Sequence, residues 1–149
     1  MNHTRDDMVG ALRAAGCRIT RQRVAIVEHL AGRSDHPSAR QIHRDLRDRN
    51  SLVSVATVYN TLASLVDLGL VREVEFESDD NRYDTNLAPH INLVCTVCGG
   101  ITDFEGEPPV SSRAILDRVG FDTVEVKMEY RGICSACSGP RPKQRGGRS

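Results

Sequence analysis

The strongest constraint on the fold of this chain is two pairs of cysteines, Cys95-Thr-Val-Cys98 and Cys134-Ser-Ala-Cys137, separated by residues 99–133. Each Cys-x-x-Cys turn presents two sulfur atoms, and two such turns supply the four thiolates of one tetrahedral Zn²⁺ site. A zinc ion with four protein thiolates has no open position for substrate or water. We therefore expect the metal to stabilise the fold, and the activity of the chain to reside elsewhere.

Paired cysteines can instead form disulfide bonds. Which of the two is expected depends on whether the chain resides in a reducing or an oxidising compartment. The 149 residues include no apolar run long enough to cross a bilayer, and the N-terminus lacks a hydrophobic signal segment. We expect a cytoplasmic chain, in which thiols stay reduced. This expectation favours zinc over a disulfide scaffold, in a chain long enough for one compact domain or two small ones.

The net charge is zero, but the charge is unevenly distributed. Residues 1–75 are slightly basic, residues 76–138 are acidic, and residues 139–149 are basic with no acidic side chain. Different charge in the two halves indicates different partners. The last segment has no apolar anchor, and we expect a disordered basic tail over 139–149.

Helix-capping residues and glycines divide the first half of the chain into four predicted helices. The first is capped by Asp6 or Asp7 and runs through Ala15, and the second is capped by Thr20. The third follows Pro37-Ser38, and the fourth follows Ser54. The apolar positions expected to face the core in the second, third and fourth helices are Val24, Val27, Leu30, Ile42, Leu46, Val55, Val58, Leu62 and Leu65.

After the fourth helix the apolar period changes to two, which predicts strands. Val74 and Phe76 alternate with glutamates, Asp79-Asp80-Asn81 predicts a turn, and 82–84 is the returning strand. Helices followed by a small hairpin predict a winged helix-turn-helix.

The second half is predicted to contain strands at 91–96 and 101–104 and a short helix near 111–119. A long strand is predicted from the alternation of Val124, Val126, Met128 and Tyr130. The predicted fold class is α+β. We expect a winged-helix DNA-binding domain over 1–85, a dimerisation and metal-binding domain over 86–138, and the tail over 139–149.

The helix after Ser54 is the candidate DNA-recognition helix. Small and hydroxylated residues on its exposed side would let it enter a major groove. The residues concerned are Ser54, Ala56, Thr57, Tyr59 and Asn60. Arg18, Thr20 and Arg23, with Arg21, are candidates for phosphate contacts that fix register. A helical protein-interaction module with a polar face is the alternative interpretation.

Five further polar residues are candidates for a second metal site: His36, Asp84, His90, Asn92 and Asp103. His90 and Asn92 are two residues apart, so on a strand they would point to the same side. Asp84 and Asp103 add hard oxygen donors. The mixed nitrogen and oxygen set favours Fe²⁺ or Mn²⁺, although the affinity order alone favours Cu²⁺ or Zn²⁺.

Four segments together resemble the ferric uptake regulator (Fur) family: Ser54-Val-Ala-Thr-Val-Tyr-Asn-Thr-Leu62, Arg18-Ile-Thr-Arg-Gln-Arg23 and the two cysteine pairs. The resemblance covers about residues 5–138. It implies a homodimer with an N-terminal winged helix and a C-terminal α/β dimerisation domain. Such dimers bind palindromic operators in double-stranded DNA and mostly repress.

The resemblance also assigns metals. His36, Asp84, His90, Asn92 and Asp103 match the family's regulatory-metal positions, which bridge the two domains. Most members have a second histidine where this chain has Asn92. A further family site is absent, because its positions fall near residues that cannot coordinate through their side chains: Pro89, Ile91, Val110 and Val126. We expect one structural Zn²⁺ and one regulatory Fe²⁺ or Mn²⁺ per subunit.

Asp103, where other members have glutamate, resembles the peroxide-responsive (PerR-like) branch of the family. In that branch Fe²⁺ reacts with hydrogen peroxide, and the ligand histidines, here His36 and His90, are oxidised. The alternative is a repressor that responds only to the level of iron or manganese. Two carboxylates with two histidines disfavour regulation by zinc or nickel.

Two further interpretations concern the cysteines. An enzyme such as a zinc deaminase needs an open zinc position and a nearby glutamate in an HxE motif, which the chain lacks, so we do not expect an enzyme. The second interpretation is a thiol switch, in which oxidation of the cysteines releases zinc. Binding of all four thiolates by zinc would protect them from oxidation. Cys17 stands outside both pairs and is expected to be a small core residue.

Overall fold

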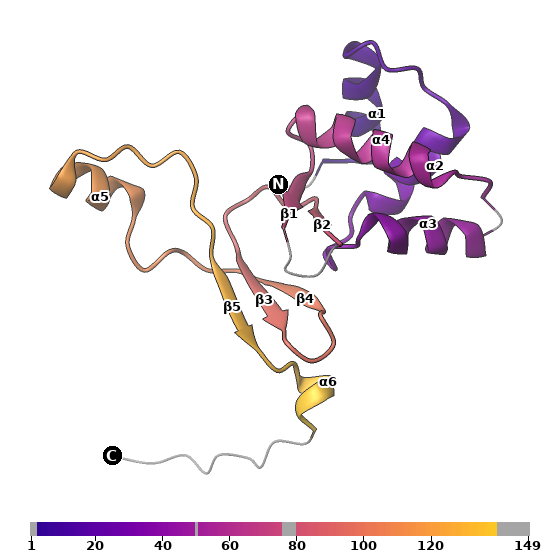
Figure 1. Ribbon diagram of the computed structural model, residues 1–149. Helices are drawn as coiled ribbons and strands as arrows, with labels where there is room; N and C mark the ends of the chain where they lie inside the picture. The colour runs from indigo at the N-terminus through magenta and orange to yellow at the C-terminus, as the bar shows by residue number, and fades with distance from the viewer. Residues whose placement is uncertain (1–2, 50, 76–79, 140–149) are drawn as a thin grey trace. The chain divides into compact units, whose positions relative to one another are not determined.

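The computed structural model describes residues 3–49, 51–75 and 80–139. The chain divides into two compact units, Met1–Ala88 and Pro89–Ser149, which are described separately (Figure 1). Most of the predicted tail, together with Phe76 and Asp79 of the predicted hairpin, lies outside the described residues. Among the described helices, none has the length and apolar character needed to cross a membrane.

The first unit begins with four helices: α1 (Arg5–Ala14), α2 (Arg21–Leu30), α3 (Ala39–Asp48) and α4 (Val55–Asp67). Thr20, Ser38 and Ser54 cap α2, α3 and α4 through their side-chain oxygens, as predicted. The prediction for α1 was wrong by two or three residues at its start. Thr4 is the cap, and Asp7 closes a capping box by accepting from the Thr4 backbone N–H.

The four helices pack around one apolar core, which sets the positions of the loops between them. Val27, Leu30, Ile42, Leu46, Val58, Leu62 and Leu65 are buried as predicted. Val55 was predicted to face inward, but it is 47% exposed in the first turn of α4 and lies outside the core cluster. In α2, Val24 is only partly buried, whereas the neighbouring Ile26 is fully buried.

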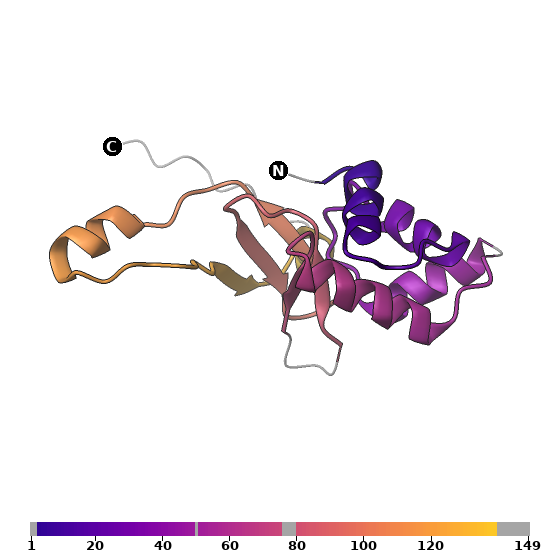
Figure 2. The same ribbon diagram turned by 90° about the horizontal axis from the view of Figure 1, so that it is seen from above.

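A two-stranded antiparallel hairpin follows the helices, as the change of period predicted. Strand β1 (Arg72–Val74) pairs with β2 (Arg82–Asp84), with Arg72 opposite Asp84. An isolated bridge joins Ser38, the cap of α3, to Arg82. This bridge fixes the loop between α2 and α3 against the hairpin. Figure 2 shows the helices of this unit, coloured indigo to magenta, from a second direction.

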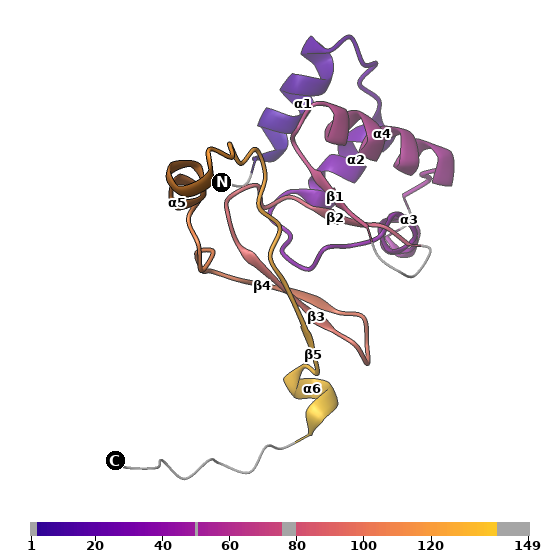
Figure 3. The same cartoon turned by 60° about the vertical axis from the view of Figure 1, so that its left-hand side comes forward.

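The second unit contains a three-stranded sheet in the order β4-β3-β5 (Figure 3). Strand β3 (Ile91–Cys95) pairs antiparallel with β4 (Ile101–Phe104) and parallel with β5 (Glu129–Gly132). Helix α5 (Ser112–Val119) lies in the connection between β4 and β5, close to its predicted position, and α6 (Ser135–Ser138) follows β5. The parallel pairing places Cys95 opposite Gly132.

The predicted long strand at 124–130 is mostly wrong. Strand β5 starts only at Glu129, and residues 124–128 form no strand with any of the described residues. Val124 is 98% exposed and Val126 is 43% exposed. Alternation shows that a segment suits a half-buried surface, but a strand also needs a neighbour that supplies hydrogen bonds. Residues 124–128 lack such a neighbour among the described strands, apart from the hydrogen bond that the Asn92 backbone N–H donates to the Met128 carbonyl at 2.9 Å, just before β5 begins.

Candidate metal centres

The four paired cysteines form one cluster in the second unit. Their sulfur atoms all lie within 4.8 Å of one another, and none of the four is in a disulfide. The Sγ atoms of Cys98 and Cys134 are 3.9 Å apart. Two sulfurs each about 2.3 Å from a tetrahedral zinc would be about 3.8 Å apart. The cluster therefore fits a closed four-thiolate Zn²⁺ site.

Sheet pairing and tight turns explain why residues so far apart in sequence meet here. The pairing of Cys95 with Gly132 brings the end of β5, and with it Cys134, beside the first turn. The Cys134 backbone N–H donates to Sγ of Cys95 at 3.3 Å. This hydrogen bond, with others from backbone N–H groups of the first turn, lowers the pKa of Cys95 to about 6. Stabilisation of the thiolate prepares that sulfur to bind a cation.

His36 and Asp84 form a buried pair in the first unit. His36 lies in the loop before α3, and Asp84 ends β2; each is 2% exposed. Nε2 of His36 is 3.5 Å from Oδ2 of Asp84. The other carboxylate oxygen accepts from the Asn86 backbone N–H at 2.7 Å, which orients the carboxylate. Two donors each about 2.1 Å from a shared ion would be about 3.0 to 3.4 Å apart, so the pair is close to ligand spacing.

His36 also has an unusual backbone. Its φ of 47° makes it the one residue other than glycine with positive φ among those described. A histidine in this region is strained relative to the ordinary helical or extended conformations. Such a conformation persists where neighbouring contacts hold it, and it is common at ligand-binding positions.

A second group, in the other unit, consists of His90, directly before β3, with Asn92 of β3 and Asp103 of β4. Asn92 of β3 lies directly opposite Asp103 of β4. Nε2 of His90 is 3.1 Å from Oδ1 of Asn92 and 3.7 Å from Oδ1 of Asp103. One imidazole nitrogen, one amide oxygen and one carboxylate oxygen thus converge. The group fits a hard divalent cation better than a soft one.

Five of the eight predicted DNA-contact residues lie together, around the start of α2 and in the N-terminal half of α4. Arg18, Thr20, Arg23, Thr57 and Asn60 line one shallow pocket in the first unit. Sequence reasoning named these residues and Arg21, but it missed Gln22, which also lines the pocket. The amide of Gln22, between arginines at the start of α2, is the signal that could have indicated it.

The remaining recognition-helix candidates behave differently from one another. Ala56 and Tyr59 are exposed on α4, as is Asn60 of the pocket. Ser54 is exposed as well, but its hydroxyl lies 2.7 Å from that of Thr57 and accepts from the Thr57 backbone N–H. Ser54 therefore serves first as the cap of α4. Cys17, which was expected to be a small core residue, is partly buried and packs against the helical core.

Comparison with known proteins identifies the class to which this fold and these sites belong. The model of the ferric uptake regulator family matches residues 14–131. The chain is 34% identical over 138 residues to the peroxide-responsive repressor PerR of Staphylococcus epidermidis, covering 92% of each chain. It is 27% identical to the Vibrio cholerae ferric uptake regulator, with a TM-score of 0.71, covering 84% of this chain and 98% of that one. A zinc-bound manganese uptake regulator is 26% identical, with a TM-score of 0.67, covering 86% and 98%.

The chain belongs to the ferric uptake regulator family. It is a PerR-like member with an α+β fold, and the family consists of metal-dependent transcriptional regulators rather than enzymes. The sequence-based predictions of family, fold class and non-enzymatic function are thereby confirmed. The roles of the individual residues remain predictions.

Proposed function

We propose that this chain is a DNA-binding transcriptional repressor whose regulatory metal is Fe²⁺ or Mn²⁺. The observation that carries this proposal is the presence, in each unit, of nitrogen and oxygen donors close to ligand spacing. His36 and Asp84 supply one part of the ligand set. His90, Asn92 and Asp103 supply the other. A separate structural Zn²⁺ would be bound by the four cysteines.

A single ion bound by both groups would couple the two units. Only residues 85–89 separate Asp84 from His90, so the linking segment is short. Metal that binds one arrangement of the units more tightly shifts the population toward that arrangement. We propose that the favoured arrangement is the one that binds DNA, in the cytoplasm of the cell.

The finer proposal is that the chain senses hydrogen peroxide. It is supported by 34% identity to peroxide-responsive repressors and by imidazoles at both histidine positions, His36 and His90. Fe²⁺, when bound, would activate the peroxide for cleavage of its O–O bond, and in the net reaction the two electrons that reduce the peroxide come from the imidazole. Overall, one peroxide oxygen is inserted at an imidazole C–H and the other leaves as water. An oxidised imidazole is a poorer ligand, so the repressor would lose metal and leave the DNA.

Mass spectrometry tests this mechanism directly. The Fe²⁺ form of the zinc-loaded protein is treated with stoichiometric peroxide, digested and compared with the Mn²⁺ form treated alike. Peptides containing His36 or His90 should gain the mass of one oxygen atom in the Fe²⁺ form only. If both peptides stay unmodified and DNA binding survives, peroxide sensing is wrong.

The second candidate is a repressor that responds only to metal level. The structural likeness to the Vibrio cholerae ferric uptake regulator and to a manganese uptake regulator favours it. In this case falling Fe²⁺ or Mn²⁺ empties the site without any covalent change. DNA binding would then follow the concentration of free metal and would recover fully when metal is restored after peroxide treatment.

We further propose that the repressor is a homodimer that binds a palindromic double-stranded operator. The second unit carries a group of exposed apolar side chains that a second copy could cover: Phe104, Val119, Phe121, Val124, Val126 and Tyr130. Helix α5 has no buried residue within the single chain. A continuous apolar surface is typical of an interaction site, and we propose that these side chains contribute to one in the dimer. In the first unit, α4 and the pocket at the start of α2 would contact DNA.

A further inference from the structure

Two hydrogen bonds connect the loop between α2 and α3 to the end of the hairpin, one on each side of the His36–Asp84 pair. The Tyr83 backbone N–H donates to the Pro37 carbonyl at 3.0 Å. The Thr85 hydroxyl donates to the Arg33 carbonyl at 2.8 Å. In sequence, Arg33 and Pro37 flank His36, while Tyr83 and Thr85 flank Asp84. The two bonds therefore set the separation of the two backbones that carry the donors.

Of these two bonds, only the one from Thr85 depends on a side chain. Thr85 is 2% exposed, so its hydroxyl is buried and needs a hydrogen-bond partner. Valine has nearly the same shape but no donor. Replacement by valine would remove the bond while leaving the packing almost unchanged.

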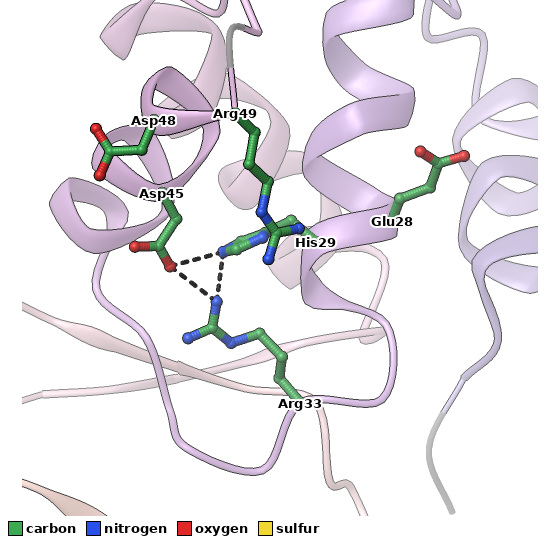
Figure 4. Close-up of a pocket in the computed structure, with 6 residues that line it drawn as sticks. All are labelled: Glu28, His29, Arg33, Asp45, Asp48 and Arg49. Atoms are coloured by element: carbon green, nitrogen blue, oxygen red, sulfur yellow. Dashed lines mark hydrogen bonds and ion pairs between the residues drawn. The ribbon is translucent and has the colours of Figure 1, made fainter.

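The other end of this bond is fixed by the Arg33 side chain. Its Nη1 is 3.0 Å from Oδ2 of Asp45 on α3 and also contacts Nε2 of His29 on α2 (Figure 4). Its Nε is 2.7 Å from Oδ1 of Asp35. Arg33 is thus attached to two helices and to its own loop. Its carbonyl is a fixed acceptor rather than part of a free loop.

We propose that Thr85 and Arg33 are positioning residues for the regulatory metal, holding His36 and Asp84 at ligand spacing before the metal binds. The proposal rests on the metal-binding role proposed above for that pair. Its physical basis is preorganisation, because donors already held in place lose less conformational freedom on binding. The strained backbone of His36 is the feature that needs such support.

The test is a titration of the zinc-loaded full-length protein with Mn²⁺, which binds without redox chemistry. Thr85→Val removes the donor, and Thr85→Ser is the matched variant that keeps it. We expect Thr85→Val to bind Mn²⁺ about tenfold more weakly, and Thr85→Ser to stay within about a factor of two of the parent. The electron paramagnetic resonance spectrum of bound Mn²⁺ should differ from that of the parent protein in Thr85→Val and match it in Thr85→Ser. Zinc content should stay the same in all three proteins.

Arg33→Met provides a second route if Thr85→Val fails to fold. It keeps an unbranched apolar stem but removes the guanidinium, and with it the contacts with Asp35, Asp45 and His29, so Mn²⁺ binding should again weaken. Arg40→Met is its matched control, because Arg40 is exposed on α3 and its ion pair with Asp80 lies outside this network. Arg40→Met should bind Mn²⁺ like the parent.

The outcomes separate this inference from the proposed function. If the parent and His36→Ala bind Mn²⁺ equally, the proposed regulatory site itself is wrong. If His36→Ala abolishes binding but Thr85→Val or Arg33→Met binds like the parent, the positioning role is wrong. Equal weakening in Thr85→Val and Thr85→Ser also overturns it, since the hydroxyl would then not be the determinant.

Discussion

Asn92 lies opposite Asp103 in the sheet, with its amide oxygen 3.1 Å from Nε2 of His90. This geometry makes the amide a candidate metal ligand in place of the histidine that the resemblance to the family leads us to expect. An amide oxygen is a harder and weaker donor than imidazole, so it lowers affinity most for Zn²⁺ and Cu²⁺. Asn92 is therefore a residue whose identity should influence which metal the site accepts.

We predict that Asn92→His raises Zn²⁺ affinity at the regulatory site by about tenfold or more, and Mn²⁺ affinity by less. Competition titrations of protein already loaded with its structural zinc measure both values. Asn81→His is the control, because it adds an imidazole in the hairpin at a residue outside both donor sets. An unchanged ratio of Zn²⁺ to Mn²⁺ affinity in Asn92→His would show that Asn92 is not a ligand.

The sequence predicted those features whose causes are local. The caps at Thr20, Ser38 and Ser54 and the spacing of the cysteine pairs are short-range signals, and the structure has helices and a sulfur cluster where they indicated. The strand at 124–128 was overpredicted because strand formation depends on a neighbour, which alternation does not report. Thr85 was missed because its partner, Arg33, is far away in sequence.

Replacing a cysteine of the cluster should unfold the second unit. We predict that Cys95→Ser loses the structural zinc, since one thiolate of the four is removed. Zinc binding at such sites contributes about 10–16 kcal/mol, more than the stability of a small domain. Metal analysis and amide hydrogen exchange of residues 91–95 and 129–132 measure the effect. The control is Cys17→Ser, in the other unit, which should bind as much zinc as the parent protein. If Cys95→Ser also binds as much zinc as the parent, the assignment of Cys95 as a zinc ligand is wrong.

A charge introduced on the exposed apolar surface of the second unit should prevent dimer formation. We predict that Val124→Asp, at a side chain that is 98% exposed in the single chain, is monomeric. A buried carboxylate without a partner costs several kcal/mol, which is enough to dissociate a dimer at micromolar concentration. Sedimentation velocity measures the mass. Leu52→Asp is the matched control, at a 92% exposed residue of the first unit, and it should stay dimeric.

Stability should depend on pH through His29. Burial, together with the nearby Arg33 charge, lowers the pKa of His29 below its usual value of 6.5, although Asp45 opposes the shift. In the unfolded chain His29 gains a proton as the pH falls through about 6.5, but in the folded chain only at lower pH. The unfolded state then binds more protons, so the free energy of unfolding falls as the pH falls below about 6.5.

Urea unfolding of zinc-loaded protein at several values from pH 7.5 to pH 5.5 would measure this effect. His29→Gln keeps an amide that can reach Asp45 but cannot titrate. Its stability should fall less steeply than that of the parent over this range, because the titrating group has been removed. Parallel curves for the two proteins would mean that His29 does not contribute to the pH dependence.

The carboxylate of Asp84 should be essential for metal-dependent DNA binding. Asp84→Asn keeps an oxygen that can accept from the Asn86 backbone N–H, and it removes the negative charge that faces His36. We predict that Mn²⁺ affinity falls about 10- to 100-fold, and that Mn²⁺-dependent DNA binding falls with it. Fluorescence anisotropy with operator DNA, at fixed salt, measures the second quantity. Asp67→Asn, at an exposed residue ending α4, is the control for loss of one negative charge. Because the cysteine cluster is untouched, zinc content should be the same in both variants, and DNA binding by Asp84→Asn at parental Mn²⁺ concentrations would contradict the assignment.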